Sequence, residues 1–303
     1  LTLLNITAKH EIAIIEMGAN HQKEIEQLCA IAEPNYGMIT NIGKAHLEGF
    51  GGYEGVIKAK CEMYDFIKKS NGKLFVNADN TLLKEKSQHV DRVLYGTSED
   101  VDFKGKYLGS NPFVKLKIQS DTKSANIDEQ PTINTQLIGG YNFENILAAA
   151  CIGHFFGISE QHIQKGIEAY IPSNNRSQIV QTASNFLLLD AYNANPSSMK
   201  AAIENFAAMD KPNKIVILGD MLELGNESEI EHLNIVELLK EKNISSVMLV
   251  GPHFKKAAAS TQATLFNTSD EALEYLRQHP VKNSNLLIKG SRGIKLEKLA
   301  EVL

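Results

Sequence analysis

The sequence of 303 residues contains few cysteines and no long hydrophobic run. Its three cysteines, Cys29, Cys61 and Cys151, are far apart and form no CxxC or Cys/His metal spacing. This usage favours a reduced, cytoplasmic protein. The longest mostly apolar stretch, residues 146–158, is too short to cross a bilayer and contains His154, so we expect no membrane insertion.

The sequence also has fewer basic than acidic residues. Lys and Arg number 31 against 36 Asp and Glu, which gives a formal net charge of −5. Proteins that bind nucleic acids or membrane surfaces carry basic patches, and we expect neither partner here. Charged residues make up 22% and hydrophobic residues 43%, which is ordinary globular usage and excludes a disordered chain. The length predicts about two domains, at roughly 150 residues for each.

Four common motifs of enzymes are missing. The sequence has no G-x-x-x-x-G-K-S/T P-loop, no G-x-G-x-x-G after a strand, no G-x-S-x-G and no H-E-x-x-H. These absences argue against a self-sufficient P-loop enzyme, a dinucleotide dehydrogenase, an α/β-hydrolase and a zincin. The sequence opens at Leu1 inside an apolar run with no charged leader, so we expect no signal peptide and a start partway through a longer polypeptide.

Apolar runs alternate with amphipathic segments, which predicts α/β architecture with parallel sheets covered by helices. In the first part, we expect strands at 11–17, 36–41, 73–77 and 92–95 and helices at 21–33, 54–69, 142–156 and 160–170. Between them, residues 102–136 alternate polar and apolar side chains, as in a small antiparallel insertion.

The second part predicts a doubly wound, Rossmann-like sheet. Its expected strands are 186–190, 214–218, 247–250, 264–267 and 286–289, and its expected helices are 197–209, 227–242, 253–260, 270–279 and 294–302. The segment IPSNNR, residues 171–176, is rich in Pro, Asn and Ser and is typical of a linker. We therefore predict two domains, residues 1–172 and 173–303.

Three residues of the first part are candidates for chemistry. Glu16 ends a predicted strand, where a carboxylate suits Mg²⁺, although a helix-capping or solvated Glu fits as well. His46 lies in the Gly-rich loop TNIGKAHLEGFG, and a lone His is more often structural than a ligand. Lys60 leans toward the packed face of its helix, while Lys58 points elsewhere. Partial burial lowers the pKa of a Lys and allows its modification, but a snorkelling Lys is the commoner case.

Polar residues also gather at a helix start and after strands of the second part. Asn142 and Asn145 lie on the first turn of a helix after a Gly pair, which suits either a purine or phosphate contact or simple N-capping by Asn142. After the strand FLLLD come side chains that can hold ribose or phosphate: Asp190, Tyr192, Asn193 and Asn195. Two more strand ends carry polar loops, with Gly219, Asp220 and Glu223 in LGDMLELG and with Lys289, Ser291 and Arg292 in KGSRG. All three loops are predicted at the carboxyl edge of one sheet.

Seven segments together resemble the Mur ligases in their order and spacing: EMGANH, TNIGKAHLEGFGGYEGVIKAKCEM, GGYNFENILAAA, NNRSQ, DAYNANPSSM, LGDMLELG and KGSRG. The resemblance covers nearly the whole sequence. It implies the central ATPase domain of the family, without its P-loop segment, followed by the C-terminal Rossmann-like domain. The UDP-substrate domain and the P-loop of the family are expected upstream of Leu1.

The resemblance also implies an activity. Mur ligases are ATP- and Mg²⁺-dependent amide ligases of peptidoglycan synthesis, cell-wall biogenesis and cell division. DAYNANPSSM, LGDMLELG and KGSRG are most similar to the branch that adds D-Ala-D-Ala to UDP-MurNAc-tripeptide through an acyl phosphate. The implied partners are these small molecules, and the implied enzyme is a cytoplasmic monomer.

Residue roles follow from the same resemblance. Glu16 and His46 are implied Mg²⁺ ligands, and Lys60 is implied to be carbamylated and to help hold a second Mg²⁺. The implied nucleotide contacts are Asn142 and Asn145 at adenine, Arg176 at the ATP phosphates on domain closure, and Asp190 with Tyr192, Asn193 and Asn195 along the cleft. The implied contacts to the incoming dipeptide are Lys289, Ser291 and Arg292. The sequence departs from the family at Tyr141, where His is more frequent, and at Lys23, where Gly is common; we expect both to be tolerated.

Other functions remain open from the sequence. A sibling Mur ligase or a folylpolyglutamate synthase-like ligase would differ in its amine substrate, and KGSRG in place of a DNPR motif argues against the diaminopimelate-adding sibling. A nucleotide-binding protein without catalysis is an alternative of another class. A purely structural protein would not explain the polar clusters at successive strand ends.

Overall fold

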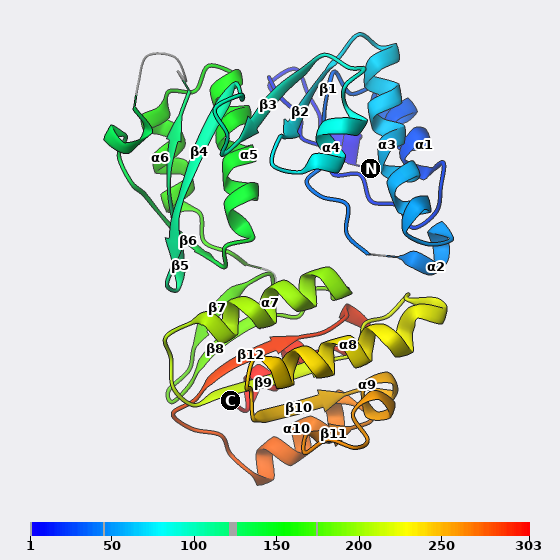
Figure 1. Cartoon of the computed structure of the whole chain (residues 1–303), viewed down its shortest axis with the longest axis vertical. Coiled ribbons are helices and arrows are strands. Elements are labelled where there is room, and N and C mark those ends of the chain that lie inside the picture. The colour runs from blue at the N-terminus through cyan, green and yellow to red at the C-terminus, as the bar shows by residue number, and fades with distance from the viewer. Residues whose placement is uncertain (1, 45, 121–125, 174) are drawn as a thin grey trace.

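The structure is a computed structural model that describes residues 2–44, 46–120, 126–173 and 175–303. It contains two six-stranded sheets, each with its own helices (Figure 1). The elements up to α6 are called the N-terminal unit below, and those from β7 onward the C-terminal unit. The predicted α/β class with two mostly parallel sheets is confirmed.

The sheet of the N-terminal unit has its strands in chain order. They are β1 (Tyr36–Met38), β2 (Lys73–Asn77), β3 (Arg92–Gly96), β4 (Phe103–Ser110), β5 (Phe113–Gln119) and β6 (Ile133–Ile138). Pairing is parallel from β1 to β4 and antiparallel from β4 to β6. The antiparallel segment is therefore present as predicted, but it extends the parallel sheet instead of forming a separate insertion.

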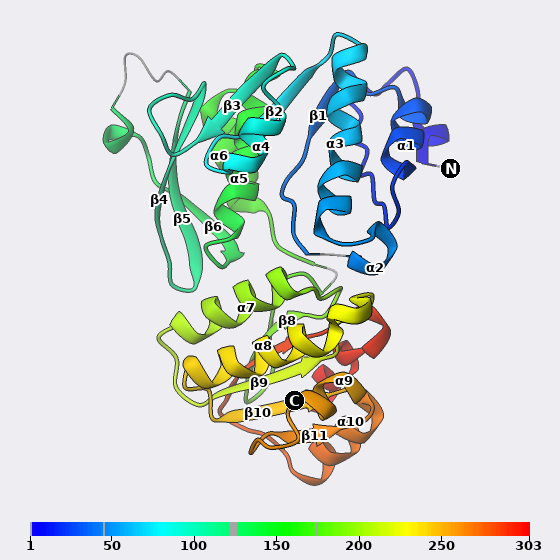
Figure 2. The same ribbon diagram turned by 45° about the vertical axis from the view of Figure 1, so that its right-hand side comes forward.

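The four helices predicted for this unit are present close to their predicted ranges, as α1 (Glu24–Ala32), α3 (Tyr53–Lys69), α5 (Asn142–Phe155) and α6 (Glu160–Ala169). Two short helices, α2 (Leu47–Phe50) and α4 (Thr81–Lys86), were not predicted. In α3, Val56, Ile57 and Ile67 are buried while Lys58 is exposed, so apolar spacing decides which face packs. The helix α1 packs against α3 beside β1 (Figure 2).

Two predictions for the N-terminal strands are wrong. Residues 11–17 form no strand, and Ile12 and Ile14 are 53% and 90% exposed. A strand requires a neighbour for its backbone N–H and C=O groups, and within the described residues β1 pairs only with β2. The predicted strand 36–41 is shortened to Tyr36–Met38, because β2 supplies register partners only as far as Met38.

The C-terminal unit has the strand order β11-β10-β9-β12-β8-β7. The strands are β7 (Gln178–Gln181), β8 (Phe186–Asp190), β9 (Lys214–Gly219), β10 (Ser246–Val250), β11 (Thr264–Phe266) and β12 (Asn285–Lys289). The five predicted strands are present and parallel. The strand β7 was not predicted; it pairs antiparallel with β8 at the sheet edge.

Four of the five helices predicted for this unit are present: α7 (Pro196–Ala208), α8 (Ser228–Glu241), α9 (Pro252–Ala257) and α10 (Ser269–Gln278). The fifth, at 294–302, is not an α-helix but two 3₁₀ segments, Arg292–Ile294 and Leu296–Glu301. Lys295 between them has a left-handed backbone (φ 59°), which interrupts any continuous helix. Leu296 and Leu299 are buried at the i, i+3 spacing that a 3₁₀ turn presents on one side.

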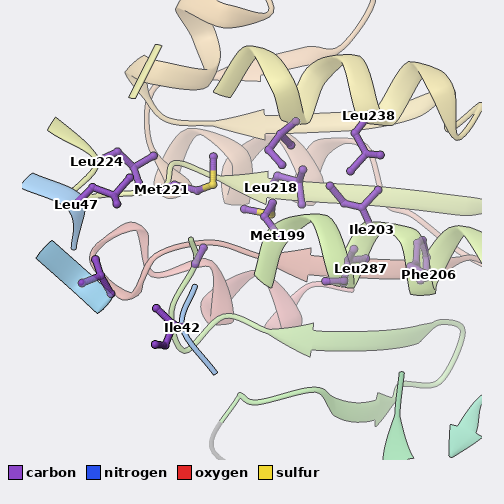
Figure 3. Packing of buried hydrophobic residues seen from close by; sticks show 14 of the residues in the cluster. Ile42, Leu47, Met199, Ile203, Phe206, Leu218, Met221, Leu224, Leu238 and Leu287 are labelled. Atoms are coloured by element: carbon purple, nitrogen blue, oxygen red, sulfur yellow. The ribbon is translucent and has the colours of Figure 1, made fainter. Parts of the chain in front are cut away.

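Side chains of α7, α8 and the central strands form a large apolar core in the C-terminal unit (Figure 3). Met199, Ile203, Phe206, Leu218 and Leu287 are fully buried there. The same cluster includes residues of the N-terminal unit, so the two units share apolar contacts. The domain boundary predicted between residues 172 and 173 lies between α6 and β7. In the described part of the chain, no helix has the length and apolar character needed to cross a membrane.

Candidate functional site

The three predicted polar loops do lie at one edge of the C-terminal sheet. The strands β8, β9 and β12 are adjacent, and the register pairs Asp190 with Lys289 and Lys289 with Leu218. The Lys289 Nζ atom lies 2.6 Å from Asp190 Oδ2 and 3.2 Å from the Asn193 carbonyl oxygen. The Lys289 side chain is only 2% exposed. Its charge is therefore compensated within the protein, and it braces the loop after β8.

Asp190 also connects this edge to the N-terminal unit. Its Oδ1 accepts a hydrogen bond from the Ser177 backbone N–H at 3.1 Å. The Ser177 hydroxyl lies 2.7 Å from the hydroxyl of Tyr141, just before α5. Burial raises the pKa of Tyr141 to about 12, so this phenol stays protonated at neutral pH. The contacts form a continuous polar chain from Tyr141 to Lys289 across the linker.

The exposed part of this edge is formed by two arginines and a tyrosine. The guanidinium carbon of Arg176 lies 4.0 Å from the ring centre of Tyr192, and that of Arg292 lies 5.7 Å from it. All three side chains are exposed. The ring attracts each cation, so both guanidinium groups are placed around one tyrosine. An exposed pair of guanidinium groups is suited to bind a phosphate or a carboxylate.

Other predicted residues of this edge have local structural partners. Asn195 caps α7: its side chain accepts from the Ser198 N–H at 2.9 Å, and the Ser198 hydroxyl completes the capping box. The Asn193 side chain accepts from the Ala194 N–H. Ser291 is buried, and its hydroxyl accepts from the Leu222 N–H at 2.9 Å. These contacts shape the loops around the arginine pair.

Asn142 and Asn145 lie on the first turn of α5, as predicted. The Asn142 amide donates to the Ile138 carbonyl oxygen at 2.7 Å, and the Asn145 amide donates to Asn142 Oδ1 at 3.2 Å. The N-cap position belongs to Tyr141, so capping by Asn142, the alternative drawn from the sequence, is not observed. Asn142 is buried and Asn145 is exposed, so Asn145 is the one accessible to a ligand.

The three residues predicted for metal binding have different environments. Lys60 is half-buried, its Nζ donates to the Asn41 carbonyl oxygen at 2.9 Å, and burial lowers its pKa. The His46 Nδ1 contacts the Glu223 carboxylate of the C-terminal unit. Glu16 is exposed in the segment 11–17, which forms no strand. Within the residues that the structure describes, no three His, Cys, Asp or Glu side chains converge on a metal-sized site. The metal roles of Glu16 and His46 stay predictions.

A buried carboxylate that the sequence placed only in a polar loop organises the strand ends. Asp220 is fully buried and accepts from the backbone N–H groups of His253 at 3.0 Å and Phe254 at 2.8 Å. Gly251 has φ 120°, and a Cβ there would lie 2.3 Å from Asp220 Cγ, so this close approach requires glycine. The structure therefore assigns Asp220 to the scaffold of the edge.

His232 is a second buried group, which sequence reasoning missed. Its Nε2 accepts from the Met221 N–H at 3.1 Å, and its Nδ1 lies 2.6 Å from the Ser228 carbonyl oxygen, which can only accept. The ring is therefore neutral with the proton on Nδ1. His232 precedes Ile235, Val236 and Leu239 on the buried side of α8, and that spacing is the signal that would have found it.

The burial of His232 predicts a pH dependence of stability. Burial lowers its pKa below the ordinary 6.5, against the opposing effects of the hydrogen bond to Ser228 and of Asp220, so the folded protein takes up a proton there less readily than the unfolded chain. The free energy of unfolding is expected to fall as the pH is lowered from 7 to 5, by at most about 1.4 kcal/mol per pH unit from this group. Urea unfolding at several pH values measures this slope.

A matched pair of variants isolates the contribution. His232→Gln should reduce the slope of unfolding free energy against pH. His89→Gln should leave it nearly unchanged, because both His89 and its neighbour Asp65, 3.6 Å away, are exposed to solvent. Equal slopes in the two variants would contradict the assignment.

Comparison with known proteins identifies the class. Residues 1–153 match the family model of the Mur ligase middle domain, and residues 175–292 match that of the Mur ligase, glutamate ligase domain. The chain belongs to the Mur ligase family, which confirms the resemblance seen in its motifs.

Particular relatives share a more specific name. The chain is 32% identical to the UDP-N-acetylmuramoyl-tripeptide–D-alanyl-D-alanine ligase of Haemophilus influenzae, over 98% of this chain and 65% of that protein. It is also 32% identical to the Escherichia coli ligase of the same name, over 100% of this chain and 67% of that protein. A crystal structure of MurF from Acinetobacter baumannii superposes with a TM-score of 0.84 at 28% identity, over 99% of this chain and 66% of that one. The chain thus spans about two thirds of the length of these relatives.

Proposed function

We propose that this protein is an ATP-dependent amide ligase that joins D-Ala-D-Ala to UDP-MurNAc-tripeptide in peptidoglycan synthesis. The observation that carries the proposal is the exposed pair of guanidinium groups on Tyr192, at the linker between the two units. The substrates and the intermediate of ligation through an acyl phosphate carry phosphate and carboxylate groups. These are the groups that guanidinium groups bind. The substrates are those in the names of the relatives.

The proposed reaction proceeds in two steps. The tripeptide carboxylate attacks the γ-phosphorus of ATP, the bond to ADP breaks, and an acyl phosphate forms. The amine of D-Ala-D-Ala then attacks the acyl carbon, loses a proton and expels inorganic phosphate as the peptide bond forms. Acyl phosphates hydrolyse readily, so the reaction requires that water be excluded when the two units close on the substrates.

We assign the nucleotide-binding residues as follows. Asn145, with Asn142 behind it, contacts the adenine side, and Arg176 contacts the phosphates. Asp190, Tyr192, Asn193 and Asn195 border the same cleft, with Asp190 fixed by Lys289. Within the KGSRG loop, Arg292 is exposed while Lys289 and Ser291 are buried and occupied. We therefore assign Arg292 to the carboxylate of the dipeptide and the other two to holding its loop.

Mg²⁺ fits the proposed donors. This ion uses one or two carboxylates and takes its remaining ligands from water and substrate phosphates, so no cluster of three protein ligands is required. Glu16 and His46 would hold one Mg²⁺ and a carbamylated Lys60 would help to hold a second, and bound Mg²⁺ would neutralise charge on the transferring phosphoryl group. Burial lowers the pKa of the half-buried Lys60, which increases the fraction of neutral amine that carbamylation by CO₂ requires, with loss of a proton as the N–C bond forms.

We further propose a cytoplasmic monomer with domains at residues 1–172 and 173–303. The cysteines Cys29, Cys61 and Cys151 are free thiols, which supports a reducing compartment. Just after the proposed boundary, Asn175 (φ 58°) and Ser177 (φ 48°) have a left-handed backbone.

Phosphate release tests the proposal, with the protein in the longest form that its gene encodes, ATP, Mg²⁺ and UDP-MurNAc-tripeptide. We expect release that depends on added D-Ala-D-Ala. Release only with another amine would assign a sibling ligase or a folylpolyglutamate synthase-like enzyme. No release with any amine would favour nucleotide binding without catalysis.

Lys60 provides an internal test of the same assay. Lys60→Ala is expected to lower the rate by about 10- to 100-fold, since it removes a proposed metal-supporting group. Lys58→Ala is the matched control, because Lys58 is exposed on the same helix and should leave the rate unchanged. Intact-protein mass would detect the carbamyl group on Lys60 directly.

A further inference from the structure

One segment of the N-terminal unit lies on the C-terminal unit. We call it the strap: residues 42–44 and 46–50, which lead into and include α2. Leu47 and Phe50 are 3% and 4% exposed and belong to the apolar cluster that contains Met221 and Leu224 (Figure 3). A Cβ added to Gly225 would lie 3.1 Å from the Cβ of Glu48. The strap is therefore in van der Waals contact with the loop between β9 and α8.

An ion pair between half-exposed Lys44 and buried Glu231 joins the strap to α8. The Lys44 Nζ atom lies 2.7 Å from Glu231 Oε1, and the Glu231 side chain is only 8% exposed. The Lys44 backbone N–H also approaches the Ser197 hydroxyl at 3.4 Å. Among the described residues, Lys44 is the one cation within salt-bridge distance of Glu231, so the buried acid of one unit depends on the other unit. The pair also raises the pKa of Lys44.

The strap is fixed to its own unit as well. The Gln22 side-chain amide donates to the Phe50 carbonyl oxygen at 3.3 Å, and the Tyr53 hydroxyl donates to that of Ile42 at 3.1 Å. Gly49 lies against the Asn20 backbone, where an added Cβ would be 2.1 Å from the carbonyl oxygen. Because the strap is held in this way, separating it from α8 requires the two units to move apart.

We propose that Lys44 and Glu231 are positioning residues, whose ion pair holds the two units in the arrangement that the ligation uses. Separation would leave Glu231 without its cation and expose Leu47 and Phe50 to water. Glu231 is buried, and a buried carboxylate that loses its cation is unfavourable, so the pair favours the joined arrangement. The kinetic consequence rests on the proposed function, but the contact itself does not.

Disulfide trapping measures the contact without any assay of activity. The Cβ of a cysteine at position 43 would lie 3.5 Å from the Cβ of Ser197, within the range that a disulfide spans. In the protein with Gly43→Cys and Ser197→Cys, we expect a cross-link under mild oxidation that neither single variant forms. Adding Glu231→Gln should slow the formation of the cross-link at least fivefold.

Two further variants keep this test decisive. Glu237→Gln is the matched control, because Glu237 lies on the same helix in an exposed pair with Lys240, and the trapping rate should not change. The exchange Lys44→Glu with Glu231→Lys should restore much of the rate. If Glu231→Gln fails to fold, Lys44→Met replaces it, since Lys44 is half-exposed.

The outcomes are separable from those of the proposed function. An unchanged trapping rate in Glu231→Gln or Lys44→Met would overturn the positioning role. If Glu231→Gln slows the trapping but the protein releases no phosphate with any amine, the positioning contact is supported and the ligase function is rejected. In an active ligase, Glu231→Gln should lower kcat, and the charge exchange should recover it.

Discussion

Lys289→Met is expected to lower the free energy of unfolding by about 3 to 5 kcal/mol, a typical cost of removing one partner of a buried ion pair. The methionine keeps most of the volume but removes the cation that lies 2.6 Å from Asp190. Asp190 would then be left with the Ser177 N–H as the one donor to its carboxylate among the described residues. Equilibrium unfolding in urea measures the difference directly.

A control variant tests whether the removal of any lysine would lower the stability by a similar amount. Lys240→Met removes a cation from an exposed pair with Glu237 and should change stability by less than about 0.5 kcal/mol. Combining Lys289→Met with Asp190→Leu should recover part of the loss, because no buried charge remains unpaired. Equal stability of Lys289→Met and Lys240→Met would show that Lys289 does not brace the loop after β8.

The sequence predicted the sites best where strand ends define them. Apolar runs such as FLLLD and LLIK gave the strands of the C-terminal sheet, and parallel pairing then requires Asp190 and Lys289 at one edge. Sequence spacing could not show that these two charges neutralise each other, because they are far apart in the chain. Lys289 was therefore predicted as a ligand, and the structure gives it a bracing contact.

The N-terminal unit was less predictable for a related reason. The run EIAIIEM has the composition of a buried strand, yet residues 11–17 form no strand and Ile12 and Ile14 are exposed, because no neighbouring strand among the described residues pairs with them. Composition reports the tendency of a segment, whereas a strand forms only with a partner. Lys23 shows the converse: its left-handed backbone (φ 74°) agrees with a position where the family commonly has Gly.

Contacts between the units left only weak signals in the sequence. Glu231 precedes Ile235 and Leu238 on the buried side of α8, which marks a buried acid but not its partner. Its partner Lys44 is 187 positions away, and the Tyr141–Ser177 bond likewise joins elements that no local pattern connects. The sequence therefore predicted the two folded units and their polar loops, but not the contacts that join the units.

Arg176→Ala is expected to lower turnover by about 10³-fold or more, the range found when an arginine that stabilises a transferring phosphoryl group is removed. Arg176 lies in the linker, its guanidinium carbon is 4.0 Å from the Tyr192 ring centre, and the side chain is exposed. The cation is thus held in place before substrate binds, which lowers the cost of ordering it. Steady-state phosphate release under saturating ATP, tripeptide and dipeptide measures the change in kcat.

Further variants distinguish position from charge. Arg176→Lys keeps the charge but loses the planar fork, so it should recover only a small part of the rate. Tyr192→Leu should moderately weaken the binding of ATP and of D-Ala-D-Ala, because the Tyr192 ring contacts both Arg176 and Arg292. Arg277→Ala is the control, since Arg277 is exposed on α10 near Glu274 and should leave turnover unchanged. If Arg176→Ala turns over as fast as Arg277→Ala, the arginine pair on Tyr192 does not serve phosphoryl transfer, and the role of Arg176 in domain closure would have to be abandoned.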